Sequence, residues 1–156
     1  MNILKGIFAT LFLFILSSLP CSAYNIRHLS KMWSLSNNSI ESLYQDQAGR
    51  LWIGTCDGVN IFDGRKIEIY QPKDRNKALL GNIIDDVIET DSNVMWIQTY
   101  YGLNKLNRNT NTVSHYADFN PKLYMTKDKQ NTLFVLQEDN LIHYYDTKKD
   151  TFNVTM

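Results

Sequence analysis

The 156-residue chain carries 16 basic and 16 acidic side chains, so its formal net charge is zero with histidine neutral. This balance argues against a general attraction to nucleic acid or to anionic lipid. A 12% share of aromatic residues suits a core rich in β-structure.

Residues 1–23 are predicted to form a secretory signal peptide. Lys5 is the only charged residue in this segment, Ile7–Leu19 is an apolar run, and the small residues before Tyr24 suit a signal peptidase. The apolar run is shorter than a comfortable transmembrane helix. The alternative is a lipoprotein anchored through Cys21. Cleavage would leave 15 basic and 16 acidic residues and a single cysteine, so we expect no internal disulfide.

Residues 24–39 are interpreted as a lead-in that contains an orphan outer strand. Ile26 and Leu29 are apolar residues three apart, and the same spacing recurs at Ile67 and Tyr70. In a closed propeller such a strand completes the final blade. The segment is therefore expected to pair with strands elsewhere in the full assembly.

The stretch from Ile40 to Tyr70 is predicted to fold as four short strands. Glycine turns at Asp46–Gly49, Cys56–Gly58 and Asp63–Gly64 separate the apolar runs. Four strands in about thirty residues leave no room for a helix.

This pattern recurs 44 residues later with eight identities and no gap. A weaker copy lies 82 residues after the first, in which Phe134 replaces Trp52, Asn140 replaces Gly58 and Tyr144 replaces Phe62. A period near 44 with four strands per unit is typical of propeller blades. The identical pairs are Leu35/Leu79, Asn38/Asn82, Ile40/Ile84, Trp52/Trp96, Ile53/Ile97, Thr55/Thr99, Gly58/Gly102 and Asn60/Asn104.

The predicted fold class is therefore all-β: about three four-stranded antiparallel β-propeller blades, an incomplete propeller, after an N-terminal signal peptide. The expected blades are residues 40–76, 77–120 and 121–156. Three blades cannot close a ring, since propellers typically have four to eight. We expect either a truncated piece of a longer protein, the favoured interpretation, or a ring completed by another chain.

The repeated residues have structural interpretations. Trp52, Trp96 and Phe134 are expected to wedge between blades. Gly58 and Gly102 are expected to need positive φ. Gly54, Thr55 and Thr99 complete the repeat signature.

No catalytic, cofactor-binding or metal-binding residue is predicted, and neither enzyme activity nor a cofactor is expected. The aspartates Asp46, Asp57, Asp63 and Asp91 lie at turns without the spacing of a calcium loop, and no catalytic motif is present.

One pair of residues suggests ligand contact. Tyr100 and Tyr101 stand where the first repeat has Cys56-Asp57, and two tyrosines on a propeller loop could stack on a sugar ring. The alternative is that they pack locally.

The residues Asp46–Gly64, DQAGRLWIGTCDGVNIFDG, resemble the two-component regulator propeller repeat, D-x-x-G-x-[LIM]-W-[IV]-G-T-x-x-G-[LV]. Gln98 replaces the motif glycine in the second repeat, and the third repeat matches faintly. The lead-in Ile26–Asn38 also resembles the start of the sensor region of hybrid two-component systems, with Ser34 where that family usually has glycine.

The resemblance implies a periplasmic sensor segment. Members of the family are inner-membrane proteins whose periplasmic propellers bind oligosaccharides and regulate glycan utilisation through a histidine kinase. The expected partners are an oligosaccharide, the remaining blades and kinase of a longer chain, and a second copy in a homodimer, with no nucleic acid bound by this segment. The segment itself lacks kinase and output domains. The alternatives are a propeller scaffold for protein–protein interaction, or part of a propeller-fold carbohydrate-active enzyme.

Overall fold

The computed structural model describes residues 34–73, 78–119 and 122–155. The predicted signal peptide and the predicted orphan strand at Ile26–Leu29 lie outside these ranges. Within them the chain forms twelve strands and no helix, so the all-β prediction is confirmed.

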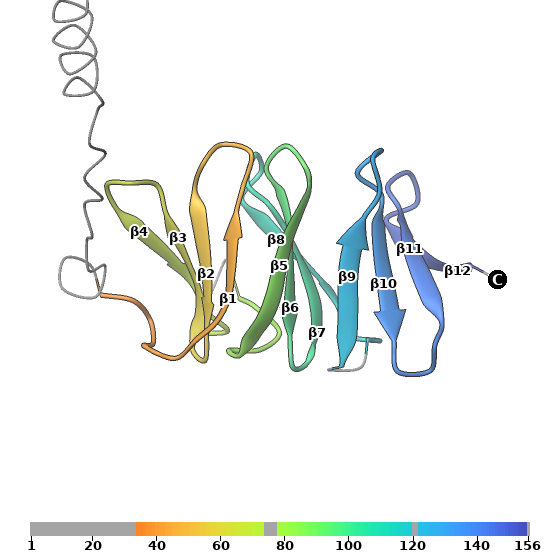
Figure 1. The fold of residues 1–156 in the computed structure, drawn as a ribbon, viewed down its shortest axis with the longest axis horizontal. Helices are drawn as coiled ribbons and strands as arrows, with labels where there is room; N and C mark the ends of the chain where they lie inside the picture. The colour runs from red at the N-terminus through yellow and green to blue at the C-terminus, as the bar shows by residue number, and fades with distance from the viewer. Residues whose placement is uncertain (1–33, 74–77, 120–121, 156) are drawn as a thin grey trace, which may run out of the picture.

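The strands form three separate four-stranded antiparallel sheets (Figure 1). In each sheet the strands follow one another in chain order, as in a meander. The first sheet contains β1 (Ile40–Gln45), β2 (Leu51–Thr55), β3 (Gly58–Phe62) and β4 (Ile67–Tyr70). The second contains β5 (Ile84–Asp91), β6 (Val94–Thr99), β7 (Gly102–Asn107) and β8 (Thr112–Tyr116). The third contains β9 (Leu123–Lys127), β10 (Leu133–Gln137), β11 (Ile142–Asp146) and β12 (Thr151–Thr155).

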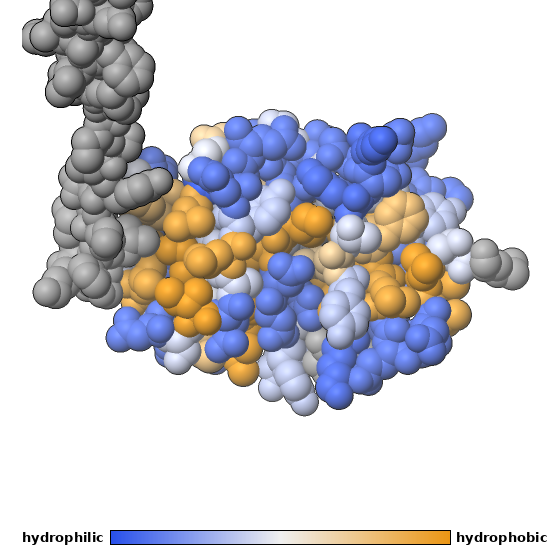
Figure 2. Space-filling model, in the orientation of Figure 1, coloured by the Kyte–Doolittle hydropathy of each residue, from blue (hydrophilic) through white to orange (hydrophobic). Residues whose placement is uncertain are grey.

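The sheets stack face to face, with β1 in contact with β5 and β5 in contact with β9. Figure 2 shows the result on one side of the molecule: a band of apolar residues across the middle, with hydrophilic residues above and below. We call the contact between the first two sheets the first seam, and the contact between the second and third sheets the second seam.

Each seam holds one apolar cluster around one tryptophan, as the sequence predicts for Trp52 and Trp96. Both indoles are fully buried. Because successive side chains of a strand point to opposite faces of its sheet, every second residue of each strand faces the same seam. The first cluster contains Trp52, Val59, Ile61, Tyr70, Leu79, Ile84, Val87, Met95, Ile97 and Leu106. The second contains Trp96, Leu103, Phe119, Leu123, Leu133, Val135 and Tyr145.

The third sheet departs from the other two in its middle turn. The β10–β11 turn is longer than its counterparts, and Phe134 pairs with Tyr144 as Trp52 pairs with Ile61. Tyr144 therefore occupies the place of Ile61, and the sequence-based match of Tyr144 to Phe62 is wrong by one residue. Phe134 itself is only half-buried, on the face that lies away from the second seam.

Candidate functional site

The two ends of the sheets differ in which turns they carry. At one end lie the β2–β3, β6–β7 and β10–β11 turns and the segments that connect the sheets; we call this the connector edge. At the other end lie the remaining hairpin turns, and we call this the hairpin edge. In Figure 1 the connector edge is below and the hairpin edge above.

The turns at the connector edge are built by the repeated threonines and glycines. Thr55 Oγ1 donates a hydrogen bond of 2.8 Å to the Gly58 carbonyl oxygen, and Thr99 Oγ1 makes the equivalent bond of 3.0 Å to Gly102. Gly58 has φ +105° and Gly102 has φ +121°, so both positions have the left-handed backbone that the sequence predicts. These bonds close each two-residue turn, and the two intervening residues of the turn in the second sheet are exposed.

Tyr100 and Tyr101 are the two intervening residues of this turn in the second sheet. Their side chains are 54% and 61% exposed, and the rings lie 5.2 Å apart and nearly perpendicular. Tyr101 also lies directly against Gly81, where a Cβ atom would come within 2.9 Å of Tyr101 Cδ2. The missing side chain at Gly81 is therefore what allows the Tyr101 ring to rest on the connector backbone.

Beside Tyr101 the first seam opens into a cavity of about 330 Å³, which we call the connector groove. It is shaped by the β2–β3 turn, the two ends of the connector between the sheets, and the β6–β7 turn. The lining residues are Asp57, Gln71, Pro72, Lys73, Leu80, Gly81, Asn82 and Tyr101. Of the predicted tyrosine pair, only Tyr101 lines the groove.

The polar groups of the groove are held in place by the fold. Gln71 Nε2 donates to both the backbone carbonyl and the carboxylate of Asp57, each at 2.8 Å. The Asn82 carbonyl accepts a bond of 2.6 Å from the Gly58 N–H. The groove thus combines one exposed aromatic ring with a carboxylate, two amides and one ammonium group. Such a set can stack on an apolar ring face and hydrogen-bond hydroxyl groups around it.

Sequence reasoning did not identify Gly81, Gln71 or Asn82 as part of a site. Asn82 was visible only as a repeat identity with Asn38. Gly81 could have been identified, because a glycine in a connector often marks a position where another part of the protein packs closely against the backbone.

Asn60 and Asn104 were also identities without a predicted role, and the structure gives them one. Both are fully buried, and each donates from Nδ2 to a carbonyl of the preceding strand. Each also accepts, at Oδ1, the N–H of the segment that leads into the same sheet, Ser36 or Leu80, at 2.8 Å. They therefore fix the connector edge from inside.

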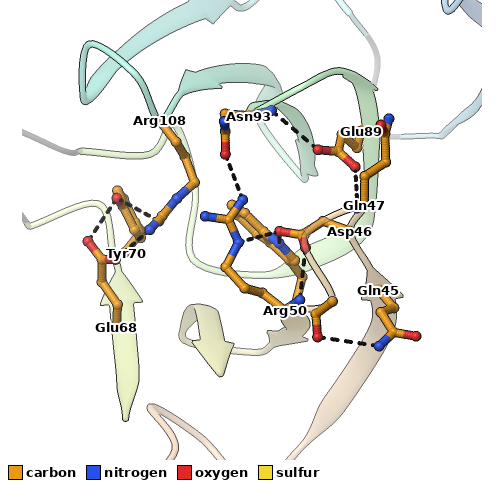
Figure 3. A network of polar contacts seen from close by, with 11 residues as sticks. Gln45, Asp46, Gln47, Arg50, Glu68, Tyr70, Glu89, Asn93 and Arg108 are labelled. Atoms are coloured by element: carbon orange, nitrogen blue, oxygen red, sulfur yellow. Dashed lines mark hydrogen bonds and ion pairs between the residues drawn. The ribbon is translucent and has the colours of Figure 1, made fainter. Parts of the chain in front are cut away.

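At the hairpin edge, Asp46 does more than cap its turn (Figure 3). It is 4% exposed and accepts hydrogen bonds from Trp52 Nε1 at 2.8 Å, Arg50 Nε at 2.6 Å and the Arg50 N–H at 2.8 Å. Burial would raise the pKa of Asp46, but these bonds and the Arg50 charge outweigh it and hold the pKa below 3.8. In the second sheet, Thr90 takes this place and accepts the Trp96 Nε1–H at 3.1 Å.

Among the residues that the structure describes, no three histidine, cysteine, aspartate or glutamate side chains are grouped so that they could hold a metal ion. Within the same ranges no helix is long and apolar enough to cross a membrane.

Residues 34–57 match the family described as two component regulator propeller. This segment of the chain is therefore similar to the two component regulator propeller repeat. The matched residues span the lead-in to β1, the first hairpin and the β2–β3 turn, which include Asp46, Trp52 and Thr55. In this repeat the aspartate accepts the indole N–H, and the threonine closes the turn that borders the connector groove.

Two solved extracellular domains are similar to this chain. The chain has 28% identity and a TM-score of 0.70 to the extracellular domain of the hybrid two component system BT3049 from B. thetaiotaomicron, covering 84% of this chain. The extracellular domain of the B. thetaiotaomicron hybrid two component system BT4673 has the same fold, with 23% identity over 83% of this chain and a TM-score of 0.63. Both structures therefore support the propeller fold.

A curated relative, Histidine kinase P4 of Formosa agariphila, is 38% identical over 69 residues, which is 42% of this chain. The chain spans 5% of that kinase and 20% of each solved domain.

Proposed function

We propose that this chain is the exported ligand-sensing propeller segment of a hybrid two-component sensor, and that its ligand is an oligosaccharide bound at the connector groove. The sensor role is supported by the likeness to extracellular domains of hybrid two component systems and to a histidine kinase. The same likeness supports a location outside the cytoplasm, in the periplasm, with a kinase and further blades supplied by a longer chain.

One observation carries the choice of ligand. The Tyr101 ring is 61% exposed, fixed against Gly81, and bordered by the carboxylate of Asp57 and the amides of Gln71 and Asn82. A sugar presents an apolar ring face and a rim of hydroxyl groups. It therefore needs one flat aromatic surface and several polar groups that can both donate and accept.

The groove also offers a route from binding to signalling. Its residues come from both sheets of the first seam and from the connector between them. A ligand that binds better to one relative placement of the two sheets favours that placement, and only this difference in affinity can drive a change. The change then reaches the kinase through the packing of successive blades.

The experiment measures binding of a panel of oligosaccharides by isothermal titration calorimetry. We expect Tyr101→Ala to weaken binding of the best ligand about tenfold, the factor that corresponds to ~1.4 kcal/mol. Gly81→Ala should weaken it comparably, because its Cβ displaces the ring. Tyr100→Ala should have a smaller effect, since its ring does not line the groove.

The matched control is Tyr124→Ala, which removes a tyrosine that is 77% exposed on β9 of the third sheet. This variant should bind like the wild type. If Tyr101→Ala and Gly81→Ala fold normally and bind every active oligosaccharide unchanged, the connector groove is not the sugar site.

A further inference from the structure

The two seams can be compared position by position, because the repeats are in register. Two arginines, Arg50 and Arg108, lie at the hairpin edge of the first seam (Figure 3). Arg50 reaches across from the first sheet and donates from Nη2 to Asn93 Oδ1 at 2.9 Å. Arg108 reaches back from the second sheet, pairs with Glu68 at 3.0 Å, and lies 5.8 Å from the centre of the Trp52 ring.

The second seam lacks both arginines at the equivalent positions. Val94 follows Thr90 by four residues as Arg50 follows Asp46; Arg50 lies directly before β2, and Val94 is the first residue of β6. Thr147 opens the β11–β12 turn as Arg108 opens the β7–β8 turn. Asn131 keeps the place of Asn93, with the same left-handed backbone, φ 64° against 66°.

A cavity of about 420 Å³ lies where the two guanidinium groups are missing, within the size range of small-molecule sites. We call it the seam cavity. It is bordered by both short replacements and by the retained asparagine. Its lining residues are Thr90, Asp91, Val94, Lys105, Asn107, Gln130, Asn131, Tyr145 and Thr147.

The chemistry of this lining is polar and nearly neutral. Three amides and three hydroxyl groups line it, and both types of group can donate and accept hydrogen bonds, while the Tyr145 hydroxyl is already bonded to Lys105 and Asp150. The Lys105 ammonium is already engaged by the Asp150 carboxylate at 2.8 Å and by the Tyr145 hydroxyl, which leaves one of its three protons for another partner. Asp91 at the rim supplies one exposed carboxylate. No excess of either charge is present to select an ion.

We propose that the seam cavity binds a small uncharged ligand rich in hydroxyl groups, in the place that Arg50 and Arg108 fill in the first seam. The site lies at the hairpin edge of the second seam, whereas the connector groove lies at the opposite edge of the first. The two sites share no residue, and binding at the seam cavity does not depend on the proposed function.

The test fills the cavity with a long side chain in place of the short Thr147 side chain. The probes are D-glucose, D-glucuronate and D-glucosamine, which compare a neutral, an anionic and a cationic form of one hydroxylated ring. Binding to the whole chain is followed by saturation-transfer NMR. Thr147→Arg restores the side chain that the first seam has, and should reduce glucose binding at least tenfold. Thr110→Arg adds the same charge in the β7–β8 turn of the second sheet, at a residue that does not line the cavity, and should leave glucose binding unchanged.

The expected result is that glucose binds, that both charged analogues bind more weakly, and that only Thr147→Arg reduces glucose binding at least tenfold. Tyr124→Ala, which removes an exposed tyrosine outside both the seam cavity and the connector groove, should not affect it. The proposal is overturned if none of the probes binds, if a charged analogue binds more tightly than glucose, or if glucose binds Thr147→Arg as well as it binds the wild type. Unchanged near-ultraviolet circular dichroism shows that each variant has kept its fold.

Discussion

At the scale of single residues, the indole N–H groups of Trp52 and Trp96 each need a buried acceptor. Asp46 serves the first and Thr90 the second, at 2.8 and 3.1 Å. The carboxylate also binds Arg50, whose guanidinium links the first sheet to Asn93 of the second. Asp46 therefore has one role that threonine can take over and one that it cannot.

Substitutions at Asp46 should separate these two roles. Asp46→Ala should lower the free energy of unfolding by about 3 kcal/mol, because the Trp52 N–H and the Arg50 guanidinium both lose a buried partner. Asp46→Thr keeps an acceptor for the indole, so its loss should be about 1–2 kcal/mol. Urea denaturation followed by tryptophan fluorescence measures both values. Equal losses would mean that the indole bond contributes nothing.

Stability should also fall in acid through Asp150. Hydrogen bonds from Lys105 and Tyr145 lower the pKa of Asp150 to about 2, from an ordinary value of 3.8. The folded state therefore holds the ionised carboxylate more strongly than the unfolded state does. Its contribution is complete above pH 3.8 and is lost as the pH falls towards 2.

The variant Asp150→Asn cannot make this contribution. We expect the difference in unfolding free energy between about pH 6 and about pH 2.5 to be smaller in Asp150→Asn than in the wild type, as measured by urea denaturation at both pH values. A pH dependence that is the same in both proteins would assign the acid sensitivity to other carboxylates, such as Asp46.

At the scale of strands and turns, Gly58 combines two constraints. Its φ of +105° is left-handed, and an added Cβ would lie 2.3 Å from the Tyr70 carbonyl oxygen of β4. Gly49, in the β1–β2 turn, has φ +80°, but an added Cβ there would meet no atom within 4 Å. Both glycines thus have a positive φ, but only at Gly58 would an added Cβ collide with a neighbouring atom.

This difference predicts the cost of each alanine. Gly49→Ala should destabilise the chain by about 1 kcal/mol through backbone strain alone. Gly58→Ala should cost about 3 kcal/mol, because β4 must also move away from the new methyl group. Thermal denaturation of the two variants gives the comparison, and similar midpoints would show that the fold relaxes freely around residue 58.

The strands and turns of the first two repeats could be predicted from the sequence because eight residues recur at one fixed spacing. The third repeat could be placed only roughly, since its longer β10–β11 turn shifts the match of Tyr144 by one residue. Tyr101 was predicted as a contact residue, but its support by Gly81 was not. That contact joins a connector to a turn, and no periodic pattern reports it.

At the scale of the whole molecule, each seam has its own set of polar contacts. In the first seam the Tyr70 hydroxyl shares its one proton between Glu68 Oε1 at 3.0 Å and Asn111 Oδ1 at 3.3 Å, and in the second seam the Tyr116 hydroxyl donates to Asp150 Oδ1 at 2.8 Å. Asn111 and Asp150 both precede the fourth strand of a sheet, and both have positive φ. The same contact is thus made twice with different residues.

Because the seams share no side chain in these contacts, their energies should add. Tyr70→Phe and Tyr116→Phe should each cost about 1 kcal/mol, and the double variant should lose the sum to within about 0.5 kcal/mol. A double-mutant cycle in urea checks this. A coupling energy well above that limit would show that the second sheet transmits strain from one seam to the other.

The connector groove and the seam cavity both straddle a boundary between two sheets, and no strand pairing crosses that boundary among the described residues. A ligand bound in either site therefore contacts two sheets at once. These sheets are otherwise joined by side-chain packing and short connectors. Such a ligand reduces the relative motion of the two sheets, even where their average positions stay the same. A change in the flexibility of one seam can then be transmitted to the neighbouring sheets.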